Sequence, residues 1–329
     1  MRARFPTIAA DRGHYESYYL RAAHPERPLA LWLRHTVHKP PGGPAVGAQW
    51  LTLFDAERGE PPAAFKASGL TPRAATAGSD TGDGIVLGDS VFTAQGVHGA
   101  TPGGEGRWAI DVRDGAPALA HLPRAWMYRA PVPRTKSGSP HPAARLHGTV
   151  ALHGRTLELD GWPGMVGHNW GAEHAERWIW LHGIAFDGAP DAWLDLVCGR
   201  IAIAGRTTPW VTNGVLHLDG VRHRLGGLGP GAIRATRVTE TPTTAHLELP
   251  GADGLRVTAT VAEPPAQAAA WRYADPSGGE HVSTHCSVAR LELALTPSGR
   301  RLTTRHAAAY ELGTREAPAG VPVLPFPDP

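Results

Sequence analysis

The stretch Gly161–Gly183, GWPGMVGHNWGAEHAERWIWLHG, combines glycine and proline with three histidines and four tryptophans. Its first residues, Gly-Trp-Pro-Gly, predict a turn, and its last residues begin an alternating run that continues to Phe186. A period of two is typical of a β-strand, because successive side chains point to opposite faces. We expect both faces to be covered, since the intervening residues are also apolar. One face would present Trp178, Trp180, His182, Ile184 and Phe186.

Similar alternating segments recur from residue 29 to residue 312, separated by Gly, Pro, Asp and Asn. Two connections predict tight hairpins, at His153-Gly154 and more strongly at Asp219-Gly220, because type I′ turns need positive φ at both central residues. Helical propensity is confined to the short run Ala266–Trp271. The 40 Gly and 31 Pro agree with this pattern, since both residues interrupt helices. The sequence therefore predicts an all-β, antiparallel fold.

Charge and composition exclude several classes of protein. Lys and Arg number 32 against 30 Asp and Glu, so the net charge of +2 argues against nucleic acid as a partner and provides no overall field for an anionic bilayer. Peripheral membrane contact stays open. No stretch approaches the ~18 apolar residues of a membrane span, and no apolar leader is evident, so we expect a cytoplasmic protein. The two cysteines, Cys198 and Cys286, are expected to be buried free thiols, with a disulfide as the alternative.

An internal repeat divides the chain into two similar halves. It aligns Trp32 with Trp180, Arg34 with His182, Trp50 with Trp193 and Thr52 with Asp195. We expect an N-terminal segment (1–24), a first domain that ends in the HNWG segment (25–171), a second domain (172–313) and a proline-rich tail (314–329) extended over the surface. The sequence leaves the oligomeric state open.

The segment GHNWG (167–171), followed by RWIWLHG (177–183), resembles the signature of the double-calycin superfamily. This superfamily contains carotenoid 1,2-hydratase (hydroxyneurosporene synthase), tocopherol cyclase and related fungal pericyclic cyclases. The resemblance extends over residues 16 to 312 and is specific for the superfamily rather than for one activity. Further similar segments are ESYYLRAA (16–23), LALWLRHTVH (29–38), QWLTLFDAERG (49–59), LHGTVALHGRTLELDGWPG (146–164) and YADPSGGEHVSTHCSVARLEL (273–293).

The resemblance implies two lipocalin-like antiparallel β-barrels in tandem, joined by the HNWG segment and enclosing a hydrophobic cavity. Calyces of this kind hold apolar ligands. Members without a metal or organic cofactor add water to long apolar polyenes or prenylated quinols, or close a ring in them. They do so by protonating an alkene or by holding the substrate in a reactive conformation. No cofactor is therefore expected.

Two polar residues in the second half are candidates for catalysis. His182 would be a general acid in an aromatic cavity, and a core histidine bonded to backbone is the alternative. Asp195 lies between Leu194 and Leu196, in line with Trp193, and would orient that histidine if the two strands are neighbours. A buried carboxylate is either paired or kept protonated, so a purely structural pair is the alternative.

The signature itself supplies His168 and Asn169. The resemblance implies that His168 donates a proton or orients a polar group, and Asn169 would fix the backbone through Asx-type bonds. An acidic residue precedes this histidine in the hydratase pattern, whereas Gly167 stands here. A local Asp–His pair is therefore missing unless Glu173 or Asp195 replaces it. Glu173 has an exposed loop position as its alternative.

Candidate ligand-binding residues are mainly aromatic. Tryptophan faces line apolar cavities and stabilise a developing carbocation through cation–π contact; the alternative is that they seal the bottom of a barrel. Arg34 would hold a carboxylate or enolate of the ligand, with stacking or a salt bridge as the alternative. The candidates are Trp32, Arg34, Trp170, Trp178, Trp180 and Trp193.

Other kinds of active site find no support. H-E-x-x-H and C-x-x-C are absent, and the pairs His217/His223 and His281/His285 have no third ligand in register, so no metal is expected. The G-x-S-x-G elbow, the P-loop and the Rossmann fingerprint are absent too.

The leading hypothesis is a cofactor-independent lyase (hydratase) or isomerase (cyclase) that acts on an apolar polyene, prenylated or polyketide-like molecule in a calyx. The alternative is a non-catalytic, lipocalin-like carrier of a hydrophobic ligand, with the same cavity but no positioned acid. A carbohydrate-binding or glycan-processing protein ranks last, because no pair of carboxylates at catalytic separation can be identified.

Overall fold

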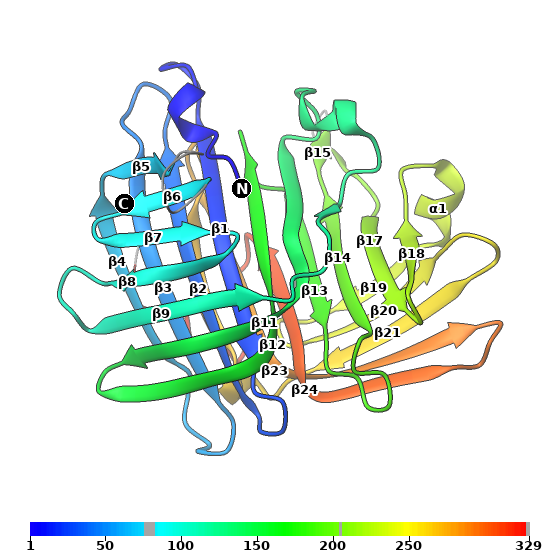
Figure 1. Cartoon of the computed structure of the whole chain (residues 1–329). Coiled ribbons are helices and arrows are strands. Elements are labelled where there is room, and N and C mark those ends of the chain that lie inside the picture. The colour runs from blue at the N-terminus through cyan, green and yellow to red at the C-terminus, as the bar shows by residue number, and fades with distance from the viewer. Residues whose placement is uncertain (76–82, 204–205, 327–329) are drawn as a thin grey trace.

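The computed structural model describes residues 1–75, 83–203 and 206–326, and nearly all of its regular structure is antiparallel β-sheet (Figure 1). Two large sheets divide the chain, which confirms the predicted all-β class. None of the helices in the described ranges is long and apolar enough to cross a membrane.

The first sheet runs in the order β4 (Ala63–Leu70), β3 (Val46–Asp55), β2 (Leu29–Lys39), β1 (His14–Ala23), β12 (Arg155–Gly171), β11 (Thr135–Leu152), β9 (Gly106–Arg113), β8 (Gly96–Ala100), β7 (Ser90–Thr93), β6 (Gly84–Leu87) and β5 (Pro72–Ala75), with β10 (Leu119–Ala120) beside β11.

The second sheet runs in the order β18 (Val221–Gly226), β17 (Val211–Leu218), β14 (Trp193–Arg200), β13 (Arg177–Gly183), β24 (Arg301–Thr314), β23 (Glu280–Thr296), β21 (Arg256–Ala262), β20 (Thr244–Pro250) and β19 (Arg237–Glu240), with β22 (Ala269–Ala274) beside β23. The remaining elements are the pair β15 (Ala202–Ile203) and β16 (Arg206–Thr207), helix α1 (Pro230–Ala235), and the 3₁₀ turns η1 (Phe5–Thr7), η2 (Ala125–Tyr128) and η3 (Pro265–Gln267).

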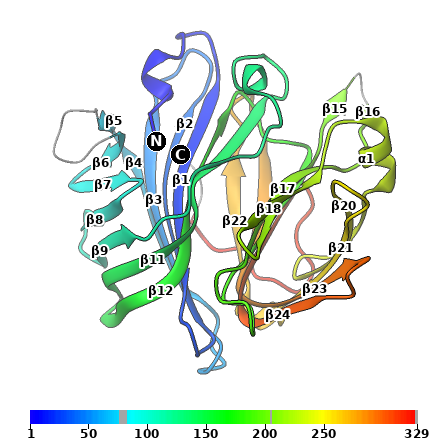
Figure 2. The ribbon, with the colours of Figure 1, turned by 45° about the vertical axis from the view of Figure 1, so that its right-hand side comes forward.

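Each sheet curls around an apolar core of its own (Figure 2). Leu20, Leu33 and Ile110 are fully buried in the first core, and Leu196 and Leu293 are buried in the second. Burial of one such side chain contributes about 1.5–3 kcal/mol. The two sheets are the tandem lipocalin-like barrels predicted from the sequence.

A third apolar layer lies between the barrels and contains residues from both sheets. Trp32 of β2 and Trp180 of β13 meet there, with ring centroids 5.2 Å apart. These are the residues that the internal repeat aligned, so the equivalent hairpins of the two halves face each other. Residues buried in this layer include Tyr19, Trp32, Phe54, Met165, Trp180, Trp193, Val215, Val288 and Ala309.

One buried cation also joins the sheets. Arg21 of β1 is fully buried and donates hydrogen bonds to the second sheet, from Nε to Ser287 Oγ (3.1 Å), from Nη2 to the Ser287 carbonyl (2.6 Å) and from Nη1 to the Ala307 carbonyl (2.9 Å). Burial lowers the pKa of Arg21 to about 9, and the charge of Glu263 acts in the opposite direction. The interface is thus fixed by polar contacts as well as by apolar packing.

Several local predictions are confirmed. His153 and Gly154 have φ of 50° and 77°, and Asp219 and Gly220 have φ of 51° and 78°, as type I′ hairpins require. Cys198 and Cys286 are buried free thiols.

The N-terminal segment and the HNWG segment differ from expectation. His14–Ala23, expected to lie in an N-terminal segment, is β1 and pairs with both β2 and β12 in the first sheet. Every residue of this strand is buried, because one face packs on the first core and the other faces the second barrel. The HNWG segment is the end of β12 rather than a linker, and the chain crosses between the sheets at residues 172–176.

Two smaller predictions were wrong. The helix-prone run Ala266–Trp271 is not helical beyond the 3₁₀ turn η3, because the residues from Ala269 onward belong to strand β22. Phe186 does not share a face with Trp180 and packs in the second core, since positive φ at Ala185 (52°) ends the alternation. In the tail, residues 315–320 are exposed or half-buried, whereas Val321 is buried in the second core and Phe326 packs against Trp271 and Phe65.

The second pair of the repeat is offset by two residues. Thr52 lies opposite Trp32 in the β2–β3 register, whereas Asp195 lies opposite His182 in the β13–β14 register. Because Trp32 corresponds to Trp180, the residue equivalent to Thr52 is Val197, which is opposite Trp180.

Candidate functional site

A cavity of about 650 Å³ lies between the two sheets. Its wall combines residues of β1, β2, β11 and β12 with residues of β13, β14, β17, β22 and β24, and the segment 121–135 completes it. The ligand site was expected inside a calyx, but the interiors of both barrels are filled by their own apolar side chains. The cavity reaches the second core only at its edge, where Ile179 and Cys198 belong to both.

Asp195 on β14 is fully buried and accepts hydrogen bonds on both oxygens. Trp180 Nε1 donates to Oδ1 over 3.0 Å and His121 Nε2 donates to the same atom over 3.2 Å, while Ser139 Oγ donates to Oδ2 over 2.5 Å. Burial tends to raise the pKa of Asp195, but His121 and, more weakly, His182 and Ser139 outweigh it and lower the pKa to about 2. The residue is therefore an ionised carboxylate.

His121 is the histidine that this carboxylate orients. It follows β10, is fully buried and lines the cavity. Its Nε2 bonds Asp195, while its Nδ1 is buried and has no hydrogen-bond partner among the described residues. A histidine whose Nε2–H is fixed by a carboxylate presents Nδ1 as a proton donor or acceptor.

Sequence reasoning missed His121. The residue stands between Ala120 and Leu122 without a motif. Its partner Asp195 comes from the other sheet, and no local pattern encodes that pairing. No acidic residue lies near His121 in the sequence, so any carboxylate that bonds it has to come from a distant part of the chain.

A second carboxylate borders the cavity. Glu311 of β24 accepts hydrogen bonds on Oε1 from Trp178 Nε1 (2.9 Å) and Ser283 Oγ (2.8 Å), and its Oε2 lies 3.9 Å from His285 Nε2. Burial tends to raise the pKa of Glu311, but its interactions with His285 and with the cationic Arg34 and the hydrogen bonds from Trp178 and Ser283 outweigh burial and lower the pKa. No local sequence pattern predicts a role for Glu311.

The two carboxylates flank strand β13. Trp178 and Trp180 lie on one face of this strand, as the alternation predicts, and both line the cavity. Each indole N–H donates to a carboxylate on a different neighbouring strand, Glu311 on β24 and Asp195 on β14. The indole rings are held in place by these bonds and form an aromatic wall.

His182 lies beside Asp195 without bonding it. The two residues are opposite each other in the β13–β14 register, as expected for neighbouring strands. However, His182 Nε2 bonds the Pro142 carbonyl over 2.8 Å, and the residue does not line the cavity. Burial lowers the pKa of His182 to about 4, so the ring is neutral near pH 7.

His168 lies on the opposite face of β12 from the cavity. Its Nε2 bonds Glu16 Oε1 over 2.8 Å, and its ring stacks on Tyr18 with centroids 4.5 Å apart. The fully buried Glu16 also accepts from Tyr18 Oη (2.8 Å) and from the backbone N–H groups of Arg4 (3.0 Å) and Phe5 (2.9 Å). This arrangement fastens the N-terminal turn η1 to the first barrel.

Asn169 and Trp170, the next two residues of the signature, lie on opposite faces of β12. Asn169 lines the cavity. Trp170 alternates away from it and packs against His168 (4.7 Å) and Tyr128 (5.9 Å). Glu173 is half-buried in the crossing segment, where its carbonyl accepts a bond from Thr135 Oγ1 (2.8 Å) and its side chain does not line the cavity.

Of the remaining ligand-binding candidates, Arg34 lines the cavity. Its guanidinium donates to Ser17 Oγ over 2.9 Å and lies 4.8 Å from the centre of the Tyr273 ring. Trp32 is buried in the apolar layer between the barrels and stacks on His285, with ring centroids 4.1 Å apart. Trp193 stacks on His217 with ring centroids 5.4 Å apart. Neither tryptophan lines the cavity.

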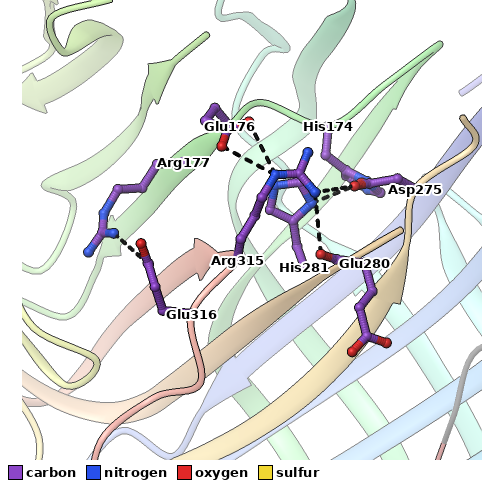
Figure 3. A network of polar contacts seen from close by, with 8 residues as sticks. All are labelled: His174, Glu176, Arg177, Asp275, Glu280, His281, Arg315 and Glu316. Atoms are coloured by element: carbon purple, nitrogen blue, oxygen red, sulfur yellow. Dashed lines mark hydrogen bonds and ion pairs between the residues drawn. The ribbon is translucent and has the colours of Figure 1, made fainter. Parts of the chain in front are cut away.

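His174, Asp275 and His281 form the cluster whose ligand atoms lie within 4.8 Å of one another, as a metal site would require. Asp275 Oδ1 accepts from both histidine Nδ1 atoms over 2.9 Å, and Arg315 donates to Oδ2 over 3.0 Å (Figure 3). Arg315 also bonds Glu176. The guanidinium already balances the carboxylate and would repel a divalent cation, so the cluster is best described as a hydrogen-bond network that fastens the crossing segment.

Comparisons with known proteins agree with this fold. No protein-family model matches the chain. The chain is 26% identical over 317 residues to an uncharacterized protein of Mycobacterium tuberculosis strain H37Rv. These aligned residues cover 95% of this chain and 90% of that protein.

Among solved structures, the crystal structure of CghA with Sch210972 superposes with a TM-score of 0.57 at 12% identity, covering 92% of this chain and 88% of that one. Kievitone hydratase from Nectria haematococca gives a TM-score of 0.49 at 9% identity, covering 92% and 89%. The likeness to CghA shows that the two chains share a fold over nearly their whole length.

Proposed function

We propose that this chain is a cofactor-independent hydratase or cyclase for an apolar polyene, prenylated or polyketide-like molecule that binds between the sheets. The observation that carries the proposal is the His121–Asp195 pair in the wall of a largely apolar cavity. An apolar cavity binds such a substrate, and an oriented histidine can act as the general acid that protonates it.

His121 is the proposed proton donor. In its protonated form, Nδ1–H transfers a proton to one alkene carbon, and a cation develops on the other carbon. Asp195 stabilises the imidazolium before the transfer and keeps the neutral ring in one orientation after it. We prefer His121 to His182 and His168, because neither of those rings lines the cavity.

The cation is then captured in one of two ways. In a hydration, a water oxygen bonds the cationic carbon and the released water proton returns to His121. In a cyclisation, a second alkene of the substrate attacks the cation and forms the new carbon–carbon bond, which leaves a cation on the second alkene. A carbon adjacent to this new cation then loses a proton to His121. The faces of Trp178 and Trp180 lie at the cavity wall and would stabilise the cation in both cases.

The opposite side of the cavity is more polar. Arg34, Tyr273 and Glu311 line it together, and their donors and acceptors suit a carbonyl, enol or carboxylate group of the substrate. A substrate with one polar end and an apolar body would be oriented by this arrangement, with its alkene toward Trp180 and His121.

A carrier is the second candidate, because both oxygens of Asp195 are already satisfied by protein donors and the cavity lining is mostly apolar. Solvent deuterium separates the two functions. Apolar molecules that copurify with the protein would be identified by mass spectrometry and incubated with it in H₂O and in D₂O.

A hydratase or proton-dependent cyclase gives a product with deuterium bound to carbon, and His121→Gln loses this conversion while retaining the ligand. The matched control is His246→Gln, because His246 is an exposed histidine on β20. Retention of an unconverted ligand by the wild-type protein in both solvents would establish the carrier.

A further inference from the structure

The exposed large apolar side chains of the described residues are unevenly distributed. They are Trp126, Val132, Val221 and Leu228, which are 61%, 59%, 52% and 42% exposed. Three of the four, all except Val221, also line the cavity between the sheets. Side chains that are both exposed and part of the cavity wall lie at its opening. We call Trp126, Val132 and Leu228 the rim.

The segment that carries most of the rim is basic. Arg124, Arg129 and Arg134 are exposed, and none of them has an ion pair among those recorded for the described residues. The sequence contains no acidic residue from Gly115 to Leu157. The chain as a whole carries only +2, so positive charge is concentrated in the segment that carries Trp126 and Val132.

We propose that the rim docks on an anionic lipid bilayer, from which the apolar ligand enters the cavity directly. Tryptophan partitions into the interface of a bilayer, and arginines beside it are attracted to anionic headgroups. A molecule that is apolar enough for this cavity is concentrated in lipid rather than in water. The proposal rests on the proposed function only in that the ligand is apolar.

Charge complementarity favours a bilayer as the occupant. An exposed tryptophan and an exposed valine lie within ten residues of three arginines, which gives the pattern of a surface-binding segment rather than that of a buried protein interface. Lipid contact at this place also brings the opening of the cavity against the acyl region. A protein partner would cover the same residues, and binding to lipid vesicles distinguishes a bilayer from a protein partner.

Vesicle flotation tests the proposal with the full chain. We expect binding to vesicles of equimolar phosphatidylglycerol and phosphatidylcholine, weaker binding as salt increases, and little binding to pure phosphatidylcholine. The triple variant Arg124→Gln, Arg129→Gln, Arg134→Gln should weaken binding about 100-fold, since each basic residue contributes about 1 kcal/mol at an anionic surface. Trp126→Ala should weaken it about 10-fold through lost apolar area.

Matched controls remove the same chemistry elsewhere. Val221→Ala truncates the exposed apolar residue that is not at the cavity, and the triple variant Arg73→Gln, Arg107→Gln, Arg256→Gln removes three exposed arginines outside the rim segment. Both controls should bind vesicles within about twofold of the wild type. Unchanged circular dichroism of all variants verifies the fold.

Three results would overturn the proposal. They are failure of the wild-type protein to bind the anionic vesicles, rim variants that bind as tightly as the controls, and a self-association measured by light scattering that Trp126→Ala abolishes while vesicle binding persists. The proposed function is tested separately, because His121→Gln should bind vesicles normally, and the triple variant of Arg124, Arg129 and Arg134, none of which lines the cavity, should still convert a substrate that is dispersed in detergent.

Discussion

The molecule contains two pairs of the same composition, a histidine whose Nε2 bonds a fully buried carboxylate: His168 with Glu16, and His121 with Asp195. The first pair lies in the first barrel and its carboxylate also accepts two backbone N–H groups of the N-terminal segment. The second pair lies between the barrels, and its histidine borders a cavity.

The difference between the pairs is what surrounds them. Glu16 uses its oxygens to fix a segment of backbone, so its histidine completes a structural network. In the described part of the chain, Asp195 is bonded by side chains only, and the second nitrogen of its histidine has no hydrogen-bond partner there. A histidine–carboxylate pair therefore indicates chemistry only where a cavity reaches it.

The largest expected effect separates the pairs by turnover. Asp195→Asn keeps a hydrogen-bond acceptor for His121 but removes the charge that stabilises the imidazolium, so conversion should fall about 10²–10⁴-fold. Glu16→Gln should leave conversion within a few-fold of the wild type. Rates measured with the copurified ligand check this, and equal losses in both variants would remove the distinction between the pairs.

The second prediction separates them by stability. Glu16→Ala deletes the acceptor for His168, Tyr18 and the backbone of Arg4 and Phe5, and should lower the free energy of unfolding by about 3–5 kcal/mol. Urea denaturation measures the loss, and limited proteolysis should cut before β1 first. Unchanged protease resistance of the first residues would show that Glu16 does not fasten them.

The third prediction concerns pH. Burial lowers the pKa of His285 and His35 to about 3 and of His182 to about 4, so the unfolded chain binds more protons than the folded one below pH 6.5. Their contribution to the free energy of unfolding is complete above the unfolded pKa of about 6.5. It decreases as the pH is lowered, so that each histidine contributes about 2 kcal/mol less at pH 5 than at pH 7. Unfolding free energies at pH 7 and pH 5 measure this loss.

Replacing one of these histidines gives the matched test. His285→Gln should reduce the difference between pH 7 and pH 5 by about 2 kcal/mol, whereas the exposed His246→Gln should leave it unchanged. An identical pH dependence in the two variants would contradict the assignment of His285 as a buried neutral ring.

The smallest expected effect tests the aromatic wall beside Asp195. Trp180→Phe keeps an aromatic face but removes the indole N–H that bonds Asp195, so affinity for a polyene probe such as cis-parinaric acid should weaken about fivefold. Trp193→Phe, outside the cavity, is the control. Equal affinities in both variants would place the ligand away from Trp180.

The fold was predictable because its signals are local. Alternation in Trp178–Gly183 and positive-φ hairpin residues such as Asp219 are visible in short windows of sequence, and the repeat revealed the two halves. The place of His14–Ala23 was not predictable in this way, because a strand buried on both faces does not show a polar side. Pairing of β1 with β12 joins residues far apart in the sequence.

The site was predictable only in part. Strand alternation correctly placed Trp178 and Trp180 on one face and Asp195 next to His182. His121 and Glu311 could not be found, because their roles depend on the packing of one barrel against the other. The same packing explains why the signature residue His168 faces away from the cavity while its neighbour Asn169 lines it.

The contacts of Arg21 with Ser287 and Ala307 have a consequence for biosynthesis. The strands of the first sheet are complete once Gly171 has been synthesised, so this barrel can fold on the ribosome. The acceptors of Arg21 and the carboxylate of Glu311 belong to the last strands translated. A nascent chain therefore exposes the outer face of its first barrel until the final strands arrive, and a product truncated before Arg301 would lack β24 and with it Glu311 of the cavity lining.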